Sequence, residues 1–310
     1  EIELAKILAN SWFKDFDLER ISYEIDEARI QRVLKPFEGR ETGPLQPGVS
    51  ADDLVSLWDY LRDNFRNSVK KLEHLYWPTA LQLAPRLNFQ ERAELFAILW
   101  GEQGELTRVY QQLAGALHKL GLPETVFAPL KALVSFENDT YSQRDSIMNV
   151  DILERFGSPR DLPIDVRPRV DGRLQNSQGI PVAQLAALTA EMTFGLIEAP
   201  ADDIVNQVDL LDIPGYRGRQ KLHEIADSND PESATKDNSV SQLILRGKVA
   251  YLFERYTDNQ EMNALVLCTN SEKQIEVPDV VPVITRWIEK TQGSDPAERA
   301  RMNGTGLIWA

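Results

Sequence analysis

Apolar residues in the first 145 positions recur at helical spacing. Two clear stripes are present. The first, on one long helix that Trp77-Pro78 ends, consists of Leu54, Leu57, Leu61, Phe65, Leu72 and Tyr76, and the second consists of Leu106, Tyr110, Leu113, Leu117 and Leu120. Intervals of three or four residues place these side chains on one face of a helix. Ser50 and Asn88 each stand where such a helix would begin and are suited to cap its first amides. The pattern predicts a helical bundle, or a helical insertion, over residues 1–145.

The hydrophobic pattern changes after residue 145. Residues 157–180 are rich in Pro, Gly, Arg and Asp and indicate a long loop, with a small hairpin at 170–173. The partly alternating stretch 188–197 and the apolar run 208–211 are each typical of a strand. A tight connection between these two strands favours an antiparallel pair.

The last third of the chain alternates helices and strands. Residues 243–256 and 280–290 have helical patterns, and the short apolar runs 263–268 and 307–309 indicate buried strands. Strands separated by helices are typical of a parallel sheet with right-handed crossovers. We therefore expect an α/β fold in which the helical bundle precedes a mostly parallel sheet over residues 146–310.

Composition and charge narrow the class of protein. Hydrophobic residues make up 42% of the 310 positions, enough for a real core, and no apolar run is long enough to span a membrane. The net charge of −14 argues against nucleic-acid binding and disfavours simple adhesion to anionic lipid, while other membrane contact stays open. The single cysteine, Cys268, fits a reducing compartment and a buried position in the core.

The candidate chemistry lies in Leu211-Asp212-Ile213-Pro214-Gly215, directly after the predicted strand 208–211. Ligands of open α/β sheets bind beyond the carboxyl ends of the strands. Asp212 could hold Mg²⁺ through a water molecule, because Mg²⁺ keeps several of its waters. Gly215 lets a backbone N–H approach a phosphate. Such a short motif also occurs as a simple turn, so the tetrapeptide alone does not decide its role.

The wider stretch from Leu185 to Arg219 resembles the SrfC-like bacterial virulence factors, and Leu211 to Gly215 resembles the third guanine-nucleotide motif of dynamin-like GTPases. The resemblance covers roughly residues 185–310. It implies a partial P-loop GTPase-like domain that binds GTP and Mg²⁺ in the intact protein. Asp212 would then hold Mg²⁺ through water, and the Gly215 N–H would meet the γ-phosphate.

The same resemblance implies roles for neighbouring residues. Residues 216–234 would form a switch loop that the phosphate orders. Arg217 and Arg219 could neutralise phosphate charge, although both also fit a solvated loop. Thr189 or Thr193 could complete the metal site, although both also fit ordinary strand positions. The implied nucleotide-binding set is Asp212, Pro214, Gly215, Tyr216, Arg217 and Arg219.

Three features depart from the GTPase pattern. The chain contains no G-x-x-x-x-G-K-[ST], and the nearest string, 43–50, has Val49 where the lysine is needed. The base-reading [NT]-K-x-D is also absent, and Tyr216 stands where Ras-like enzymes place a water-orienting Gln. We expect the P-loop to precede Glu1 and the base-reading motif to follow Ala310. The chain alone would then bind nucleotide weakly, and no catalytic residue is assigned.

Two hypotheses follow. In the first, the chain is an internal piece of a GTP-binding virulence factor, cytoplasmic in a bacterium or secreted without a cleaved signal. In the second, it is a non-catalytic module whose helical part docks a protein partner and whose Asp212–Gly215 segment is only a turn. A protein partner for the helical part is expected in both.

Overall fold

The computed structural model divides into two compact units. Unit 1 comprises Glu1–Thr189 and Gln220–Gly247, and unit 2 comprises Ala190–Arg219 and Lys248–Ala310. Helix α9 (Val240–Asp258) contributes residues to both. The structure describes residues 1–137, 139–195, 197–199, 201–202, 207–208, 211–213, 221–223, 225, 240–268, 277–301 and 306–309.

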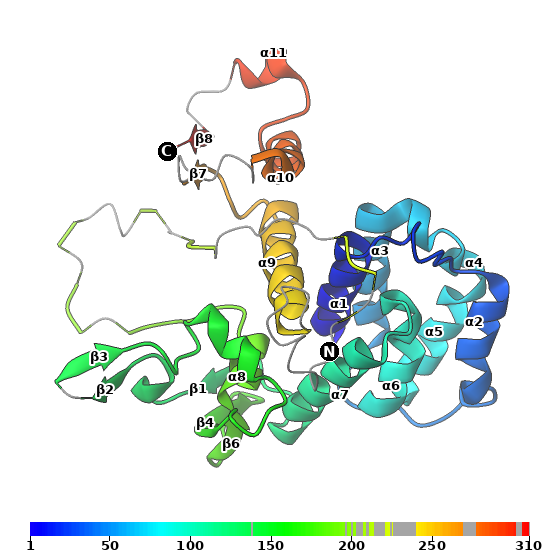
Figure 1. Ribbon diagram of the computed structural model, residues 1–310, viewed down its shortest axis with the longest axis horizontal. Helices are drawn as coiled ribbons and strands as arrows, with labels where there is room; N and C mark the ends of the chain where they lie inside the picture. Colours follow the sequence, from blue (N-terminus) through cyan, green and yellow to red (C-terminus); the bar gives the residue numbers. More distant parts are fainter. Residues whose placement is uncertain are drawn as a thin grey trace. The chain divides into compact units, whose positions relative to one another are not determined.

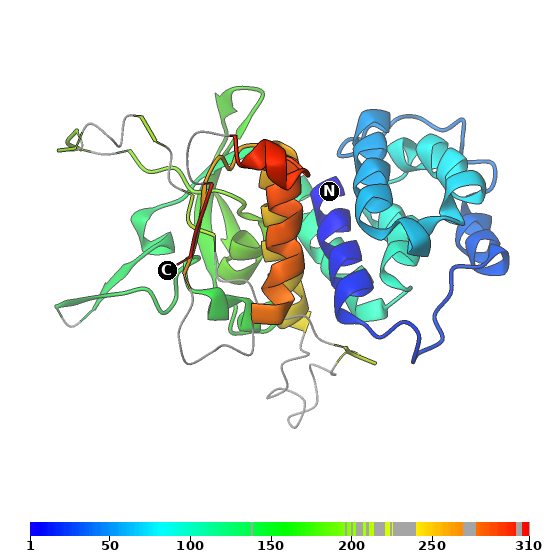
Figure 2. The same cartoon turned by 90° about the horizontal axis from the view of Figure 1, so that it is seen from above.

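The first part of unit 1 is helical (Figure 1). Its helices are α1 (Ile2–Asp15), α2 (Glu27–Leu34), α3 (Ala51–Val69), α4 (Leu72–Leu75), α5 (Trp77–Leu83), α6 (Phe89–Phe96) and α7 (Gly104–Lys119). Helix α1 packs against α3 and α7, and α6 packs against α7; Figure 2 shows these helices from above. The predicted apolar stripes on α3 and α7 are buried except for the partly exposed Leu117, which confirms that both segments are helical. The predicted single helix up to Tyr76 was wrong in its extent, because α3 ends at Val69 and Leu72 begins the separate helix α4.

Both predicted helix starts are confirmed by reciprocal caps. The Ser50 hydroxyl accepts the Asp53 amide at 3.1 Å, and the Asp53 carboxylate accepts the Ser50 amide at 2.8 Å. Asn88 and Glu91 cap α6 in the same way. Each pair satisfies amides that the first helical turn leaves without an intrahelical partner. Ser50, the last residue of the loop string 43–50, is thus a cap.

Residues beyond α7 form strands where helix or loop was expected. These strands are β1 (Thr125–Phe127), β2 (Ser135–Glu137), β3 (Thr140–Ser142), β4 (Pro163–Val170), β5 (Arg173–Leu174) and β6 (Gln178–Pro181). All of them pair antiparallel. The helical prediction for 1–145 and the loop prediction for 157–180 were therefore wrong here. In β4 the buried Ile164 and Val166 alternate with exposed residues, a strand signal that the surrounding prolines and charges obscured.

The predicted hairpin at 170–173 is confirmed. Val170 pairs with Arg173, and the two turn residues have positive φ, 48° at Asp171 and 73° at Gly172. Two central residues in the left-handed region match the twist of antiparallel strands.

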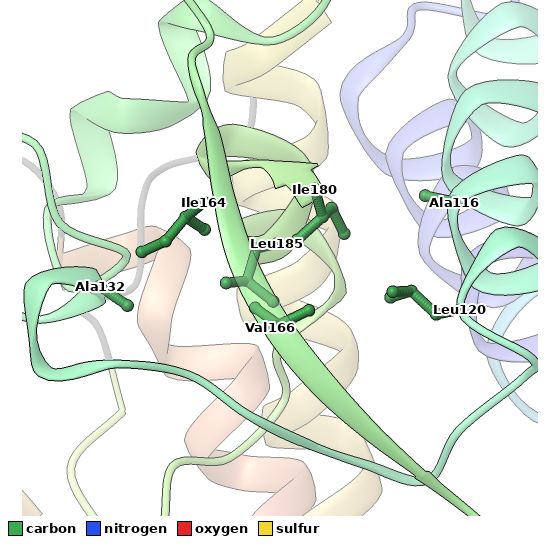
Figure 3. Packing of buried hydrophobic residues seen from close by; sticks show 7 residues of the cluster. All are labelled: Ala116, Leu120, Ala132, Ile164, Val166, Ile180 and Leu185. Atoms are coloured by element: carbon green, nitrogen blue, oxygen red, sulfur yellow. The ribbon is translucent and has the colours of Figure 1, made fainter. Parts of the chain in front are cut away.

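A small apolar core joins this sheet to the helices of unit 1 (Figure 3). Ile164, Val166 and Ile180 of the strands meet Leu185 of α8 (Val182–Leu188). Ala116 and Leu120, at the end of α7, and Ala132 of the short helix η4 (Leu130–Ala132) complete the core. The sheet is thereby covered by helices on its apolar face.

The predicted strand 188–197 is wrong over its described residues, and the predicted strand 208–211 is described only at Val208 and Leu211, since Asp209 and Leu210 lie outside the described residues. Helix α8 ends at Leu188, and residues 189–195 have neither helix nor strand. Val208 and Leu211–Ile213 are likewise not in a strand, and the side chains of Val208 and Leu211 are half exposed. A strand requires a hydrogen-bonded neighbour, and no described strand pairs with either segment.

Unit 2 contains the parallel pairing that the sequence predicted. Strands β7 (Leu265–Leu267) and β8 (Leu307–Trp309) pair in parallel, with α10 (Val277–Thr291) and α11 (Pro296–Arg299) between them in sequence. The described sheets are nevertheless mostly antiparallel, so the mostly parallel sheet was a wrong prediction. Val266 and Ile308 are about half exposed, and Cys268 is exposed, whereas burial was predicted for all three.

Candidate nucleotide site

Asp212 lies beside the apolar cluster of unit 2. The cluster consists of Tyr256, Met262 and Trp287, and the partly buried Ile213 packs against it. Leu265 of β7 and Leu307 of β8 pack against the same three side chains. The Asp212–Ile213 dipeptide is therefore held next to the parallel strand pair through the side chain of Ile213, while Asp212 itself is exposed.

Two polar contacts fix this cluster. The indole Nε1 of the fully buried Trp287 donates a 3.2 Å hydrogen bond to the carbonyl oxygen of Met262. The Tyr256 hydroxyl donates to the carboxylate of Glu191. Burial, supported by the Glu191 contact, raises the pKa of Tyr256 to about 12. Tyr256 therefore stays protonated at neutral pH and keeps its donor role. Glu191 was assigned to a strand, and no sequence signal indicated that it would accept a hydrogen bond from Tyr256.

Thr189 and Thr193, the two candidate metal ligands, have different surroundings. The Thr189 hydroxyl donates to the Leu185 carbonyl at 2.7 Å and so closes the end of α8. Thr193 is exposed. Among the described contacts, no hydrogen bond joins either threonine to Asp212, so a threonine ligand stays a prediction. Pro214, Gly215, Tyr216, Arg217 and Arg219 lie outside the described residues, and their roles stay predictions as well.

Charged side chains near the cluster are already paired with each other. The Asp258 carboxylate at the end of α9 accepts from Arg286 at 3.2 Å and also from Lys290, both on α10. These contacts join α9 to α10, and they account for the Asp258 carboxylate without a metal ion. Within the described residues, no group of three or more His, Cys, Asp or Glu side chains could hold a metal ion. Magnesium commonly uses only one or two protein carboxylates, so Asp212 alone is compatible with it.

The predicted switch range 216–234 includes a described segment that belongs to unit 1. The Leu222 amide donates to the Asp15 carbonyl at 2.8 Å, and the Asp17 amide donates to the Leu222 carbonyl at 2.9 Å. Leu222 thereby forms an isolated parallel bridge with Phe16, directly after α1, and its side chain is buried. The sequence did not predict this contact, because a single bridging residue leaves no periodic pattern.

A family model described as "Putative bacterial virulence factor" matches residues 1–310. The chain belongs to this family. The match extends the resemblance noticed over residues 185–310 to the helical part of unit 1. No curated protein matches the chain, and no solved structure matches it. Of the helices described in this family member, none is long and apolar enough to cross a membrane.

Proposed function

We propose that this virulence-factor family member binds GTP with Mg²⁺ in its full-length form, and that Asp212 holds the metal through water. The observation that carries the proposal is the packing of Ile213 on the cluster that also receives Leu265 and Leu307. This packing anchors the Asp212–Ile213 dipeptide to the parallel strand–helix–strand unit of unit 2. The sequence Asp-Ile-Pro-Gly would there supply a carboxylate for the metal and a glycine amide for a phosphate.

The chemistry that this site would serve is hydrolysis of the β–γ phosphate bond. Water attacks the γ-phosphorus, the bond to the bridging oxygen breaks, and GDP and inorganic phosphate leave. Catalysis of this reaction depends on positioning the reactants and on neutralising the negative charge of the phosphates. Bound Mg²⁺ would neutralise part of that charge. Because the sequence of this chain lacks the phosphate-binding lysine motif, the proposal concerns the natural full-length protein.

The test is equilibrium binding of a fluorescent GTP analogue to the full-length protein, with Mg²⁺ and with EDTA. Asp212→Ala is expected to weaken binding about tenfold or more in Mg²⁺, and to have little effect in EDTA, because the lost group acts through the metal. Asp202→Ala, which removes another exposed aspartate of unit 2, is the matched control. Equal affinity of Asp212→Ala and wild type, or no binding by the folded wild-type protein, would contradict the proposal.

A second candidate function, docking of a protein partner, is favoured by exposed apolar side chains in unit 1. Phe136 and Tyr141 are cross-strand partners on β2 and β3, with ring centroids 4.9 Å apart and exposed fractions of 59% and 75%. Leu130 and Met148 are also exposed. Contiguous exposed apolar surface commonly marks an interaction site. If this surface docks a partner, the double variant Phe136→Ser/Tyr141→Ser abolishes partner binding and leaves nucleotide binding unchanged.

A further inference from the structure

The outward face of the sheet formed by β1, β4 and β5 carries two arginines. In β4 the exposed Arg167 and Arg169 alternate with the buried Val166 and Pro168. Val166 points into the apolar core that joins the sheet to the helices of unit 1 (Figure 3). Because successive side chains of a strand point to opposite faces, both arginines lie on the face that the core leaves open.

Two exposed apolar side chains flank these arginines on the neighbouring strands. Phe127 of β1 stands directly opposite Arg167, and Leu174 of β5 stands directly opposite Arg169. Residues in direct register share one face of a sheet. Phe127 and Leu174 are each 45% exposed. We call these four residues the arginine face.

Both guanidinium groups are held in place, but neither is neutralised. The Arg169 guanidinium lies over the Phe127 ring, 4.8 Å from its centroid, and the Arg167 Nε donates to the Gln175 carbonyl at 3.3 Å. Within the described part of the chain, neither arginine forms an ion pair, not even Arg167 with Asp165, which lies two positions earlier on the same face. In a chain with a net charge of −14, a pair of cations that the described acids leave unneutralised is unusual.

The spacing and the chemistry of the arginine face fit an extended acidic peptide. A guanidinium binds a carboxylate through two parallel hydrogen bonds. Alternate residues of a strand are about 6.6 Å apart, and so are alternate residues of an extended peptide. Carboxylates at positions i and i+2 of a peptide therefore match Arg167 and Arg169. Apolar side chains beside those carboxylates match Phe127 and Leu174.

The net charge of the chain favours a short acidic segment over a polyanion. Electrostatic interactions are screened beyond about 8 Å at physiological ionic strength, so two carboxylates respond mainly to the arginines that they touch. A nucleic acid or an anionic bilayer presents many charges to a broad surface, and a net charge of −14 repels such a ligand.

We propose that the arginine face binds an extended segment of a partner protein, with acidic residues at positions i and i+2 and apolar residues beside them. The arginines select the carboxylates, and Phe127 and Leu174 cover the apolar side chains of the segment. The arginine face belongs to a different sheet from Phe136 and Tyr141. The inference does not depend on nucleotide binding.

Fluorescence anisotropy of the full-length protein with two labelled peptides tests the spacing. The first peptide is Gly-Leu-Thr-Glu-Thr-Glu-Thr-Leu-Gly, whose two acids point to one side of an extended chain. The second, Gly-Leu-Thr-Glu-Glu-Thr-Thr-Leu-Gly, has the same composition, but its acids point to opposite sides. The first peptide is expected to bind about fivefold more tightly, and its affinity should fall as salt is added. Equal affinity for the two peptides, or binding of neither, overturns the inference.

Single substitutions test the position of the charge. Arg169→Glu is expected to weaken binding of the first peptide about tenfold or more, because repulsion replaces attraction. Arg173→Glu is the matched control, because it makes the same change in net charge at an exposed position of β5. Its register partner is Val170, so Arg173 lies on the other face from Arg169, and the control should bind like wild type. An equal loss in the two variants overturns the inference.

A charge exchange tests the direct contact. The double variant Arg167→Glu/Arg169→Glu should bind a form of the first peptide with lysine in place of both glutamates more tightly than wild type binds it. Both substitutions are at exposed positions, and circular dichroism checks that the variant is folded. Failure of the folded double variant to gain affinity overturns the inference. Binding of phosphatidylserine vesicles that requires Arg169, without binding of the first peptide, also overturns it and identifies a lipid as the occupant.

Discussion

The guanidinium of Arg92 and the carboxylate of Glu1 form an ion pair of 2.9 Å in which both side chains are fully excluded from solvent. Arg92 also donates to three backbone carbonyls, those of Gln46, Pro47 and Ala84. Glu1 accepts in addition from the Tyr110 hydroxyl at 3.0 Å and contacts His118. Arg92 thus uses four of its five N–H donors, and both carboxylate oxygens of Glu1 accept hydrogen bonds. The pair ties the loop before α3 to α1, α6 and α7.

Arg92→Met is expected to destabilise the protein strongly. The substitution keeps the length of the side chain but leaves the Glu1 carboxylate buried without the guanidinium that balances its charge, which costs about 3–5 kcal/mol. Urea unfolding of the full-length protein measures the loss. Arg108→Met, which removes an exposed arginine that pairs with Glu105, should change stability by less than about 0.5 kcal/mol. Equal effects of the two substitutions would show that the buried pair contributes no more than a surface one.

Gly101 occupies a position where no side chain fits. Its φ is 68°, and a Cβ atom there would lie 2.2 Å from the nearest ring atom of Trp12, which is itself fully buried. Gly101→Ala is expected to lower the melting temperature, with a loss of about 2–3 kcal/mol from overpacking and backbone strain. Gly104→Ala, in the first turn of α7 with open space around its Cβ position, should be neutral or slightly stabilising. A melting temperature for Gly101→Ala that equals that of Gly104→Ala would show that Trp12 moves aside freely.

The Asp161 carboxyl makes the free energy of unfolding depend on pH, and the surroundings of this group decide the sign of the dependence. Its Oδ1 accepts the Ala183 amide at the start of α8 at 2.8 Å, whereas its buried Oδ2 has no hydrogen-bond partner within the described structure. Burial raises the pKa of the Asp161 carboxyl, although the backbone amides of α8 oppose the shift. The folded chain thus keeps this proton to higher pH than the unfolded chain does. The Asp161 carboxyl therefore contributes to the free energy of unfolding at pH values below its pKa in the unfolded chain. This contribution is lost as the pH rises through the higher pKa that the group has in the folded chain.

Asp161→Asn keeps an acceptor for the Ala183 amide and removes the titration. Relative to wild type, the free energy of unfolding of Asp161→Asn should therefore increase between about pH 4 and pH 7. Asp161→Ala, which loses the cap as well, should be less stable than Asp161→Asn by about 1 kcal/mol at pH 7. Urea unfolding at both pH values measures this, and a shift in favour of wild type as pH rises would contradict the assignment.

The sequence predicted elements whose signals are local. The stripe Leu54, Leu57, Leu61 and the caps at Ser50 and Asn88 follow from helical geometry alone, and all were confirmed. The turn at Asp171–Gly172 was recognised because it needs two residues that tolerate positive φ. The parallel pairing of β7 and β8 was predicted because strands separated by a helix pair in this way.

The parts of the fold and of the candidate site that were not predicted depend on contacts between distant residues, which no local sequence pattern encodes. Strand β4 was taken for a loop, because its two prolines and its charges outweighed a short alternation. Residues 188–197 were taken for a strand, although the apolar residues before Leu188 complete a helix that covers β4 and β6. For the candidate site, the sequence identified Asp212 but gave no sign that Ile213 would pack on Trp287 or that Leu222 would bind the end of α1.

Calorimetric titration of the natural full-length protein with GTP, in Mg²⁺ and in EDTA, tests the central claim most directly. The account predicts saturable binding of one nucleotide per chain, tighter in Mg²⁺ than in EDTA, because the metal joins the phosphates to Asp212. Absence of heat and of saturation with protein shown to be folded by circular dichroism would contradict the claim. The docking surface around Phe136 and Tyr141 would then be the better account of this family member.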